Sequence, residues 1–160
     1  YLDVITRKTA ILFAAACYGA SALSGAEEQA RQQQHAFGLN LGIAFQMIDD
    51  VLDYDGDADT MGKNIGDDLT EGKATLPLIY TLKHGSPNDQ GLVRAAITGK
   101  SAEHIEAIIQ AVNRCGALDY TRDRAKHYHD LALQSLDLLV ESPWKTSMSE
   151  ITALSIARDH

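Results

Sequence analysis

Three aspartates at helical spacing are the residues of this chain best suited to chemistry: Asp49, Asp50 and Asp53. On a helix that advances about 100° per residue, Asp49 and Asp53 lie only about 40° apart. Asp50 projects about a quarter-turn away, and Gln46 lies near the same face one turn earlier. Carboxylates this close repel one another unless a cation neutralises them. The pattern therefore indicates a hard divalent cation, Mg²⁺ above all, which bridges protein carboxylates to phosphate oxygens.

The acidic character continues beyond these aspartates. From residue 49 to residue 72 the chain carries nine acidic residues and one lysine, a formal charge of −8 that equals the net charge of the whole chain. A solvated acidic helix end is the simplest alternative to a metal site. Apolar neighbours argue against this alternative because they predict that much of the helix is buried: Phe45, Met47, Ile48, Val51 and Leu52.

A calcium-binding EF-hand is a second alternative, because acidic residues alternate as its ligands do: Asp53, Asp55, Asp57 and Asp59. An EF-hand loop requires glycine at its sixth position and a bidentate glutamate at its twelfth. In the register that starts at Asp53 these positions hold Ala58 and Asn64. The register that starts at Asp55 fails in the same way, so an EF-hand is excluded.

Two lysines frame the glycine-rich segment that follows the aspartates, Lys63 and Lys73. Ammonium groups that face a metal cluster can neutralise a leaving diphosphate as mobile point charges. Alternatively, the two lysines only offset neighbouring aspartates in water, and the charge pattern leaves both interpretations open. Lys8 and Thr9, at the head of the first predicted helix, are weaker candidates, since most such pairs are surface residues.

The elements that position these residues are all predicted to be helices. Apolar residues recur at helical spacing from Val4 to Leu23, and one long helix from Glu27 to Tyr54 carries the aspartates. Gly38 and Gly42 share a face of that helix and predict close approach of another helix or a ligand. After a glycine-rich loop over residues 55–73, helices are predicted at residues 76–83, 89–97, 102–115, 117–140 and 143–158. Strand alternation is absent, so the predicted fold class is all-α.

The composition narrows the class of protein further. A length of 160 residues with 45% hydrophobic content suits one domain. The acidic balance argues against nucleic acid as the main partner, and the most apolar stretch, residues 10–25, is too short and too weakly apolar for stable membrane insertion. Cys17 and Cys115 lack CxxC spacing, which is typical of reduced thiols in a cytoplasmic protein.

The motifs are more specific in their order than any of them is alone. Phe45-Gln46 precedes the three aspartates, Gly62-Lys63 follows them, and the run from Gly66 to Pro77 contains Gly72-Lys73. This ordered set resembles the second half of the trans-polyprenyl diphosphate synthases, and the similarity covers nearly all 160 residues. The aspartates are similar to the family's second aspartate-rich motif, and Lys8-Thr9 matches the Lys-Thr pair on the preceding helix.

The resemblance implies a helical bundle of the isoprenoid synthase type. Residues 1–160 would be the C-terminal part of a single domain, with the N-terminal half absent. The whole protein would be a cytoplasmic, homodimeric prenyltransferase: an allylic diphosphate ionises, and isopentenyl diphosphate attacks the carbocation. Tyr120-Thr121-Arg122 and Pro143-Trp144 are most similar to the bacterial octaprenyl branch of the family, which implies a long-chain all-trans product.

The resemblance also implies roles for individual residues. Several Mg²⁺ ions would be shared between a first aspartate-rich motif in the missing half and three ligands in this chain: Asp49, Asp50 and Asp53. The substrate diphosphate would bind Lys8, Thr9, Gln46, Lys63 and Lys73. Asp49, Asp50 and Lys63 would be catalytic. Because the first motif and the isopentenyl diphosphate site would lie in the missing half, this chain alone would be inactive.

Two other classes of protein are alternative interpretations of this sequence. A non-catalytic subunit or interaction module would keep the same helical scaffold, but a scaffold requires no costly cluster of charge. A terpene cyclase also uses metal-bound carboxylates on helices, but we would not expect it to carry the Gly-Lys-x-x-Gly-Asp-Asp loop.

Overall fold

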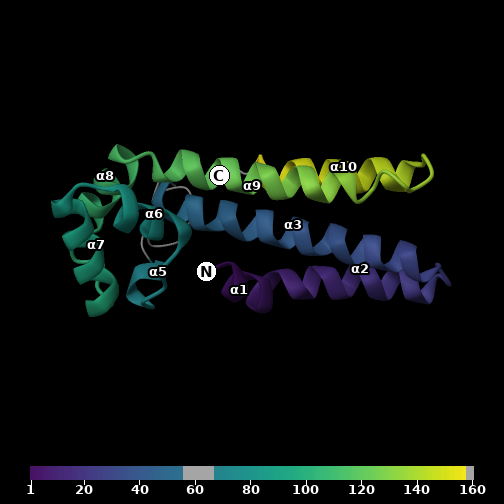
Figure 1. The fold of residues 1–160 in the computed structure, drawn as a ribbon, viewed down its shortest axis with the longest axis horizontal. Coiled ribbons are helices and arrows are strands. Elements are labelled where there is room, and N and C mark those ends of the chain that lie inside the picture. Colours follow the sequence, from purple (N-terminus) through teal and green to yellow (C-terminus); the bar gives the residue numbers. More distant parts are fainter. Residues whose placement is uncertain (56–66, 158–160) are drawn as a thin grey trace. The chain divides into compact units, whose positions relative to one another are not determined.

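The computed structural model describes residues 1–55 and 67–157, and these residues form helices and connecting turns without a strand. The predicted all-α class is confirmed. In chain order the helices, labelled in Figure 1, are α1 (Leu2–Ile5), the π-helical turn η1 (Thr6–Ala10), α2 (Ile11–Leu23), α3 (Glu28–Asp55), α5 (Asp67–Thr70), α6 (Leu76–His84), α7 (Pro87–Gly99), α8 (Ile105–Arg114), α9 (Ala117–Gln134) and α10 (Pro143–Ile156).

The chain forms two compact units. Unit 1 contains Tyr1 and Asp49–Asp123, and unit 2 contains Leu2–Ile48 and Arg124–Arg158. Helices α3 and α9 therefore each contribute residues to both units.

Unit 2 is built from long helices that pack side by side. Figure 1 shows α2 alongside α3 and α10 alongside α9. Its core joins Phe37 and Leu41 of α3 to Ala132 of α9 and to Leu136, which lies just beyond the end of α9. Partly buried side chains pack against this core: Phe13, Cys17, Leu133, Leu139 and Met148. Four helices thus share one core within this unit.

The contact between α2 and α3 depends on two glycines. A Cβ added to Gly38 would lie 2.4 Å from the carbonyl oxygen of Phe13, and one added to Gly42 would lie 2.6 Å from Cα of Ala10. Both distances are far below any real contact of a Cβ atom, so only glycine permits this approach. The predicted close approach at these glycines is confirmed, and the approaching group is another helix.

Unit 1 buries the end of α3. Helices α6, α7 and α8 pack on one another, and α5 packs against α7. The core of this unit contains Val51 and Tyr54 of α3, together with Leu69, Leu78, Val93, Ala96, Ile108, Val112, Ala117 and Leu118. Because α3 contributes to this core, the turns that carry the aspartates are fixed by burial of their apolar neighbours.

One predicted helix is wrong in its length. The sequence predicts a helix over residues 117–140, but α9 ends at Gln134. Beyond that residue the backbone amides of Leu136, Asp137 and Leu139 each bond the carbonyl three residues earlier, so the chain continues in tight turns. Apolar residues continue through this segment, and their spacing alone cannot distinguish such turns from a helix.

The glycine contact predicts opposite effects for two similar substitutions. Gly42→Ala should destabilise the intact protein by about 1–3 kcal/mol, because the new Cβ meets backbone that cannot move aside cheaply. Gly19 of α2 has no atom within 4 Å of an added Cβ. Gly19→Ala should therefore stabilise the protein by about 0.5–1 kcal/mol through helix propensity. Urea denaturation measures both, and equal effects of the two substitutions would contradict the close packing.

Candidate metal and diphosphate site

The three aspartates lie on the last two turns of α3, which has no basic residue in its final turn. The helix dipole is negative at this end and adds to the repulsion between the carboxylates. Asp50 is buried, with 3% of its surface exposed, whereas Asp49 and Asp53 are half-buried. The neighbours Met47 and Val51 are buried, which confirms that this is not a solvated helix end.

Asp50 accepts a hydrogen bond from a residue that sequence reasoning missed. The hydroxyl of Tyr1 donates to Oδ2 of Asp50 over 2.5 Å. Burial raises the pKa of the Tyr1 hydroxyl far above its ordinary value, and the negative charge of Asp50 raises it further. Tyr1 is therefore a neutral phenol that can donate at any physiological pH. No motif marks it, because it lies forty-nine residues from Asp50 in the chain.

A second buried tyrosine lies close to the same acidic groups. The hydroxyl of Tyr54 accepts a hydrogen bond of 3.3 Å from Thr75. Burial raises the pKa of Tyr54, and the charges of Asp53, Asp68 and Asp50 raise it further. The charge of Asp68 thus raises the pKa of both Tyr1 and Tyr54. The sequence shows Asp68 only as one of several acids in the loop.

Lys73 is paired with acids of its own segment. Its Nζ atom lies 2.5 Å from Oδ1 of Asp68 and 2.7 Å from Oε2 of Glu71. Hydrogen bonds to these two carboxylates raise the pKa of Lys73 above its usual value. Of the two interpretations of this lysine, the offset of local acids is the arrangement present in the structure. Lys63 lies outside the described residues.

In unit 2, two predicted diphosphate ligands contact each other. The hydroxyl of Thr9 donates to Oε1 of Gln46 over 2.9 Å. Thr9 belongs to η1, a turn wider than an α-helical turn and a form found frequently at functional sites. The neighbouring contact of Ala10 with Gly42 holds η1 against α3. Lys8 lies on the same turn and is exposed.

The donor chemistry of these residues suits only one kind of metal site. Within residues 1–55 and 67–157, no group of three or more His, Cys, Asp or Glu side chains could hold a metal by itself. The carboxylates at the end of α3 are hard oxygen donors. They fit an ion such as Mg²⁺ that keeps several waters and takes further ligands from phosphate. They do not fit a cage made only of protein ligands.

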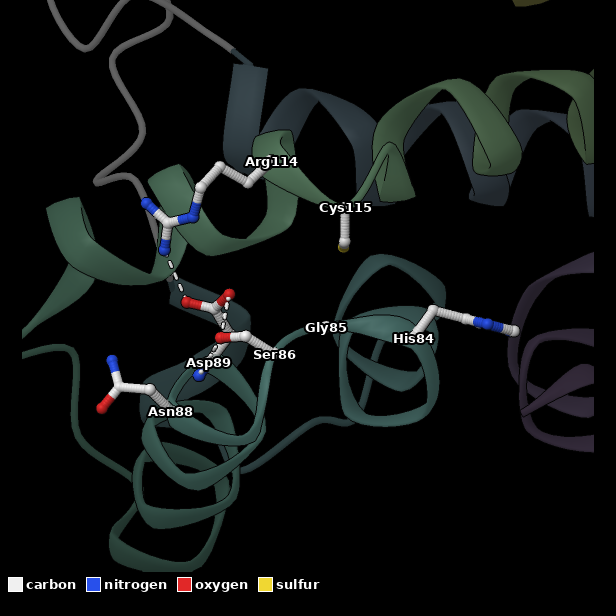
Figure 2. A pocket seen from close by; sticks show the side chains of 7 residues that line it. All are labelled: His84, Gly85, Ser86, Asn88, Asp89, Arg114 and Cys115. Atoms are coloured by element: carbon white, nitrogen blue, oxygen red, sulfur yellow. Dashed lines mark hydrogen bonds and ion pairs between the residues drawn. The ribbon is translucent and has the colours of Figure 1, made fainter.

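A cavity of about 470 Å³ in unit 1 contains none of the predicted site residues. It is lined by His84, Gly85, Ser86, Asn88, Asp89, Arg114 and Cys115. Figure 2 shows Arg114 and Ser86 both reaching Asp89. The guanidinium lies 2.5 Å from Oδ1 of Asp89, and the Ser86 hydroxyl donates to Oδ2 and caps α7. These polar groups are engaged in holding the α6–α7 turn against α8, which is a structural role.

Comparison with known proteins decides the family. The model of the polyprenyl synthetase family matches residues 1–115. The chain belongs to this family. The resemblance seen in the ordered motifs is therefore confirmed.

Relatives with curated names support the same assignment. The chain is 40% identical over 160 residues to octaprenyl diphosphate synthase of Escherichia coli, covering 99% of this chain and 50% of that protein. It is 43% identical over 158 residues to an all-trans-nonaprenyl-diphosphate synthase of Rhodobacter capsulatus, covering 99% of this chain and 48% of the relative. The chain thus spans about half the length of the curated relatives it matches.

Solved structures show the same fold. A polyprenyl synthase from Caulobacter crescentus, complexed with calcium and isoprenyl diphosphate, superposes with a TM-score of 0.91 at 37% identity. That match covers 100% of this chain and 49% of the solved one. A decaprenyl diphosphate synthase from Rhodobacter capsulatus gives a TM-score of 0.90 at 32% identity, over 100% of this chain and 50% of that one. The expected isoprenoid synthase bundle is confirmed for the half that this chain spans.

Each helix in the described part of the chain is too short or too polar to cross a bilayer.

The buried Asp89 predicts a specific dependence of stability on pH. Hydrogen bonds from Ser86 and Arg114 lower the pKa of Asp89 below its ordinary value of 3.8. The ionised form therefore stabilises the fold above pH 3.8, and this contribution is lost as the pH falls through 3.8 toward the lower pKa of the folded state. Asp89→Asn should lower the melting temperature at pH 7, and the gap to the parent should narrow as the pH falls toward 3.

Thermal melts over this pH range, with the exposed Asp119→Asn as the control, measure the effect. A gap for Asp89→Asn that is the same at pH 7 and pH 3 would contradict the role of its charge.

Proposed function

We propose that the protein containing this chain is a trans-polyprenyl diphosphate synthase that makes a long-chain product, octaprenyl diphosphate being the expected one. It condenses an allylic diphosphate with isopentenyl diphosphate. The observation that carries this proposal is the set of carboxylates on the buried end of α3 in a member of the polyprenyl synthetase family. The name of the E. coli relative supports the expected chain length.

The carboxylates supply the metal side of the proposed reaction. Asp49, Asp50 and Asp53 are the expected oxygen ligands, and Asp49 and Asp50 the expected catalytic ones. When bound, Mg²⁺ would neutralise the negative charge that develops as diphosphate leaves the allylic carbon. The solved polyprenyl synthase from Caulobacter crescentus is complexed with calcium and isoprenyl diphosphate, which supports the pairing of a divalent ion with a diphosphate.

The remaining residues would hold the diphosphate itself. Lys63 and Lys73 supply positive charge from the segment after α3, and Lys63 is the expected catalytic lysine. The Thr9 hydroxyl orients the amide of Gln46, and Lys8 lies on the same turn as Thr9. An ammonium group has three N–H donors, so a diphosphate oxygen can join Asp68 and Glu71 around Nζ of Lys73.

We further propose that residues 1–160 are the C-terminal part of a single helical domain whose other half carries a first aspartate-rich motif and the isopentenyl diphosphate site. Apolar side chains on α2 support a covering partner for this helix: Leu12 and Leu23 are both exposed. The chain alone would then be inactive. A cytoplasmic homodimer is the expected form of the whole enzyme, as the family resemblance implies.

Asp49→Asn in the full-length protein tests the metal role. Turnover should fall by several orders of magnitude with the helices intact, because the substitution removes a charged metal ligand. Asp55→Asn is a matched control on the same helix, since Asp55 is paired with Arg122 at the surface. It should retain near-parental turnover. Steady-state rates over a series of Mg²⁺ concentrations test the role of Asp49, and circular dichroism checks that the helices are intact. Parental rates for Asp49→Asn would show that Asp49 is not a metal ligand.

Lys73→Ala separates its two interpretations. If Lys73 binds diphosphate, the substitution should weaken allylic substrate binding and slow turnover by an amount equivalent to about 1.5–3 kcal/mol. If it only offsets acids, kinetics should be unchanged and stability should shift within about 0.5 kcal/mol. Lys145, which pairs with Glu141 at 2.6 Å, provides the control. Lys145→Ala should leave KM and kcat at parental values in the same assay.

A further inference from the structure

Asp50 differs from the other two aspartates in its surroundings. It is 3% exposed, and it is held by a hydroxyl from the first residue of the chain, Tyr1. A buried carboxylate is costly unless donors satisfy it, and a donor to a charged acceptor forms a short, strong hydrogen bond. The 2.5 Å distance from the Tyr1 hydroxyl to Oδ2 of Asp50 is of this kind.

The hydrogen bond also fixes a direction. A donor that holds one oxygen of a carboxylate restricts rotation of the whole group. The other oxygen therefore points along a defined line. Tyr1 is half-buried, and its hydroxyl is the donor to Oδ2 of Asp50. The interaction joins residues of one compact unit, since Tyr1 and Asp50 both belong to unit 1.

We propose that Tyr1 is a positioning residue for Asp50: its hydroxyl holds the carboxylate in the orientation that receives a Mg²⁺–diphosphate complex. This inference rests on the proposed function, because it assumes that Asp50 is one of the metal ligands. Tyr1 acts through Asp50 and does not contact the ion.

The chain offers a control for the loss of a phenol hydroxyl. Tyr54 belongs to the same unit and is buried. Its hydroxyl is bonded to Thr75 at 3.3 Å and not to a carboxylate. Each substitution leaves a phenylalanine in place of the tyrosine, and the hydrogen bond that is lost is to Asp50 in one case and to Thr75 in the other.

The experiment titrates MgCl₂ into the full-length protein in the presence of inorganic diphosphate and follows binding by calorimetry. Tyr1→Phe should raise the Mg²⁺ concentration for half-maximal binding roughly ten-fold or more, the effect of losing one hydrogen bond to a charged group. Tyr54→Phe should leave it within about two-fold of the parent, and both variants should melt cooperatively. An unchanged value for Tyr1→Phe, or equal shifts for both, would overturn the proposal.

A double substitution tests whether Tyr1 acts through Asp50. In an Asp50→Asn background, Tyr1→Phe should produce no further loss of Mg²⁺ binding, since the group it positions has changed. A full additional loss would show that Tyr1 acts independently and would overturn the proposal. This arm also applies if Tyr1→Phe lowers stability, because both proteins compared then carry the same carboxylate change.

The binding readout separates this inference from the proposed function. If Tyr1→Phe weakens Mg²⁺–diphosphate binding in a protein that makes no polyprenyl product, the proposed synthase activity fails and the role of Tyr1 stands. If the parent condenses its substrates and Tyr1→Phe binds Mg²⁺ normally, the synthase assignment stands and the role of Tyr1 fails. A parent that binds no Mg²⁺ with diphosphate would overturn the role of Tyr1.

Discussion

Repulsion between carboxylates at the buried end of α3 is the constraint on which the site depends. Asp50 is buried, its neighbours on the helix are acidic, and the helix dipole adds further negative potential at the same end. The chain compensates for this charge in part. Tyr1 donates to Asp50, and Lys73 pairs with Asp68 and Glu71. A divalent cation would add to this compensation, which is the physical reason that we propose one here.

The rest of the fold holds this acidic helix end in place. Val51 and Tyr54 anchor it in the core formed with α6, α7 and α8. Earlier on the same helix, Gly38 and Gly42 admit the backbone of η1 and α2 to distances that no other residue allows. That approach brings Thr9 to Gln46. The scaffold thus positions two sets of candidate site residues, one in each compact unit: carboxylates in unit 1 and a hydroxyl–amide pair in unit 2.

Much of this could be predicted from the sequence because it follows from periodicity. The long helix, the burial of Val51 and the close approach at Gly42 are each signalled by a local pattern, the apolar spacing around Val51 and the pairing of Gly38 with Gly42 on one face. The bond between Tyr1 and Asp50 could not be predicted, since it joins positions whose proximity only the tertiary fold creates. The carboxylate partners of Lys73 were foreseeable only as one of two alternatives, because charge pattern does not fix side-chain direction. The π-helical turn that carries Thr9 leaves no signature in residue type.

We propose that the aspartates of α3 bind a metal ion that is itself bound to diphosphate. The most direct measurement is a crystal structure of the full-length protein grown with Mn²⁺ and inorganic diphosphate, with the metal located by its anomalous scattering. We expect a metal peak within coordination distance of the Asp49 carboxylate, with diphosphate oxygens completing the coordination shell of the metal. Well-ordered diphosphate with every metal peak remote from the α3 aspartates would contradict it.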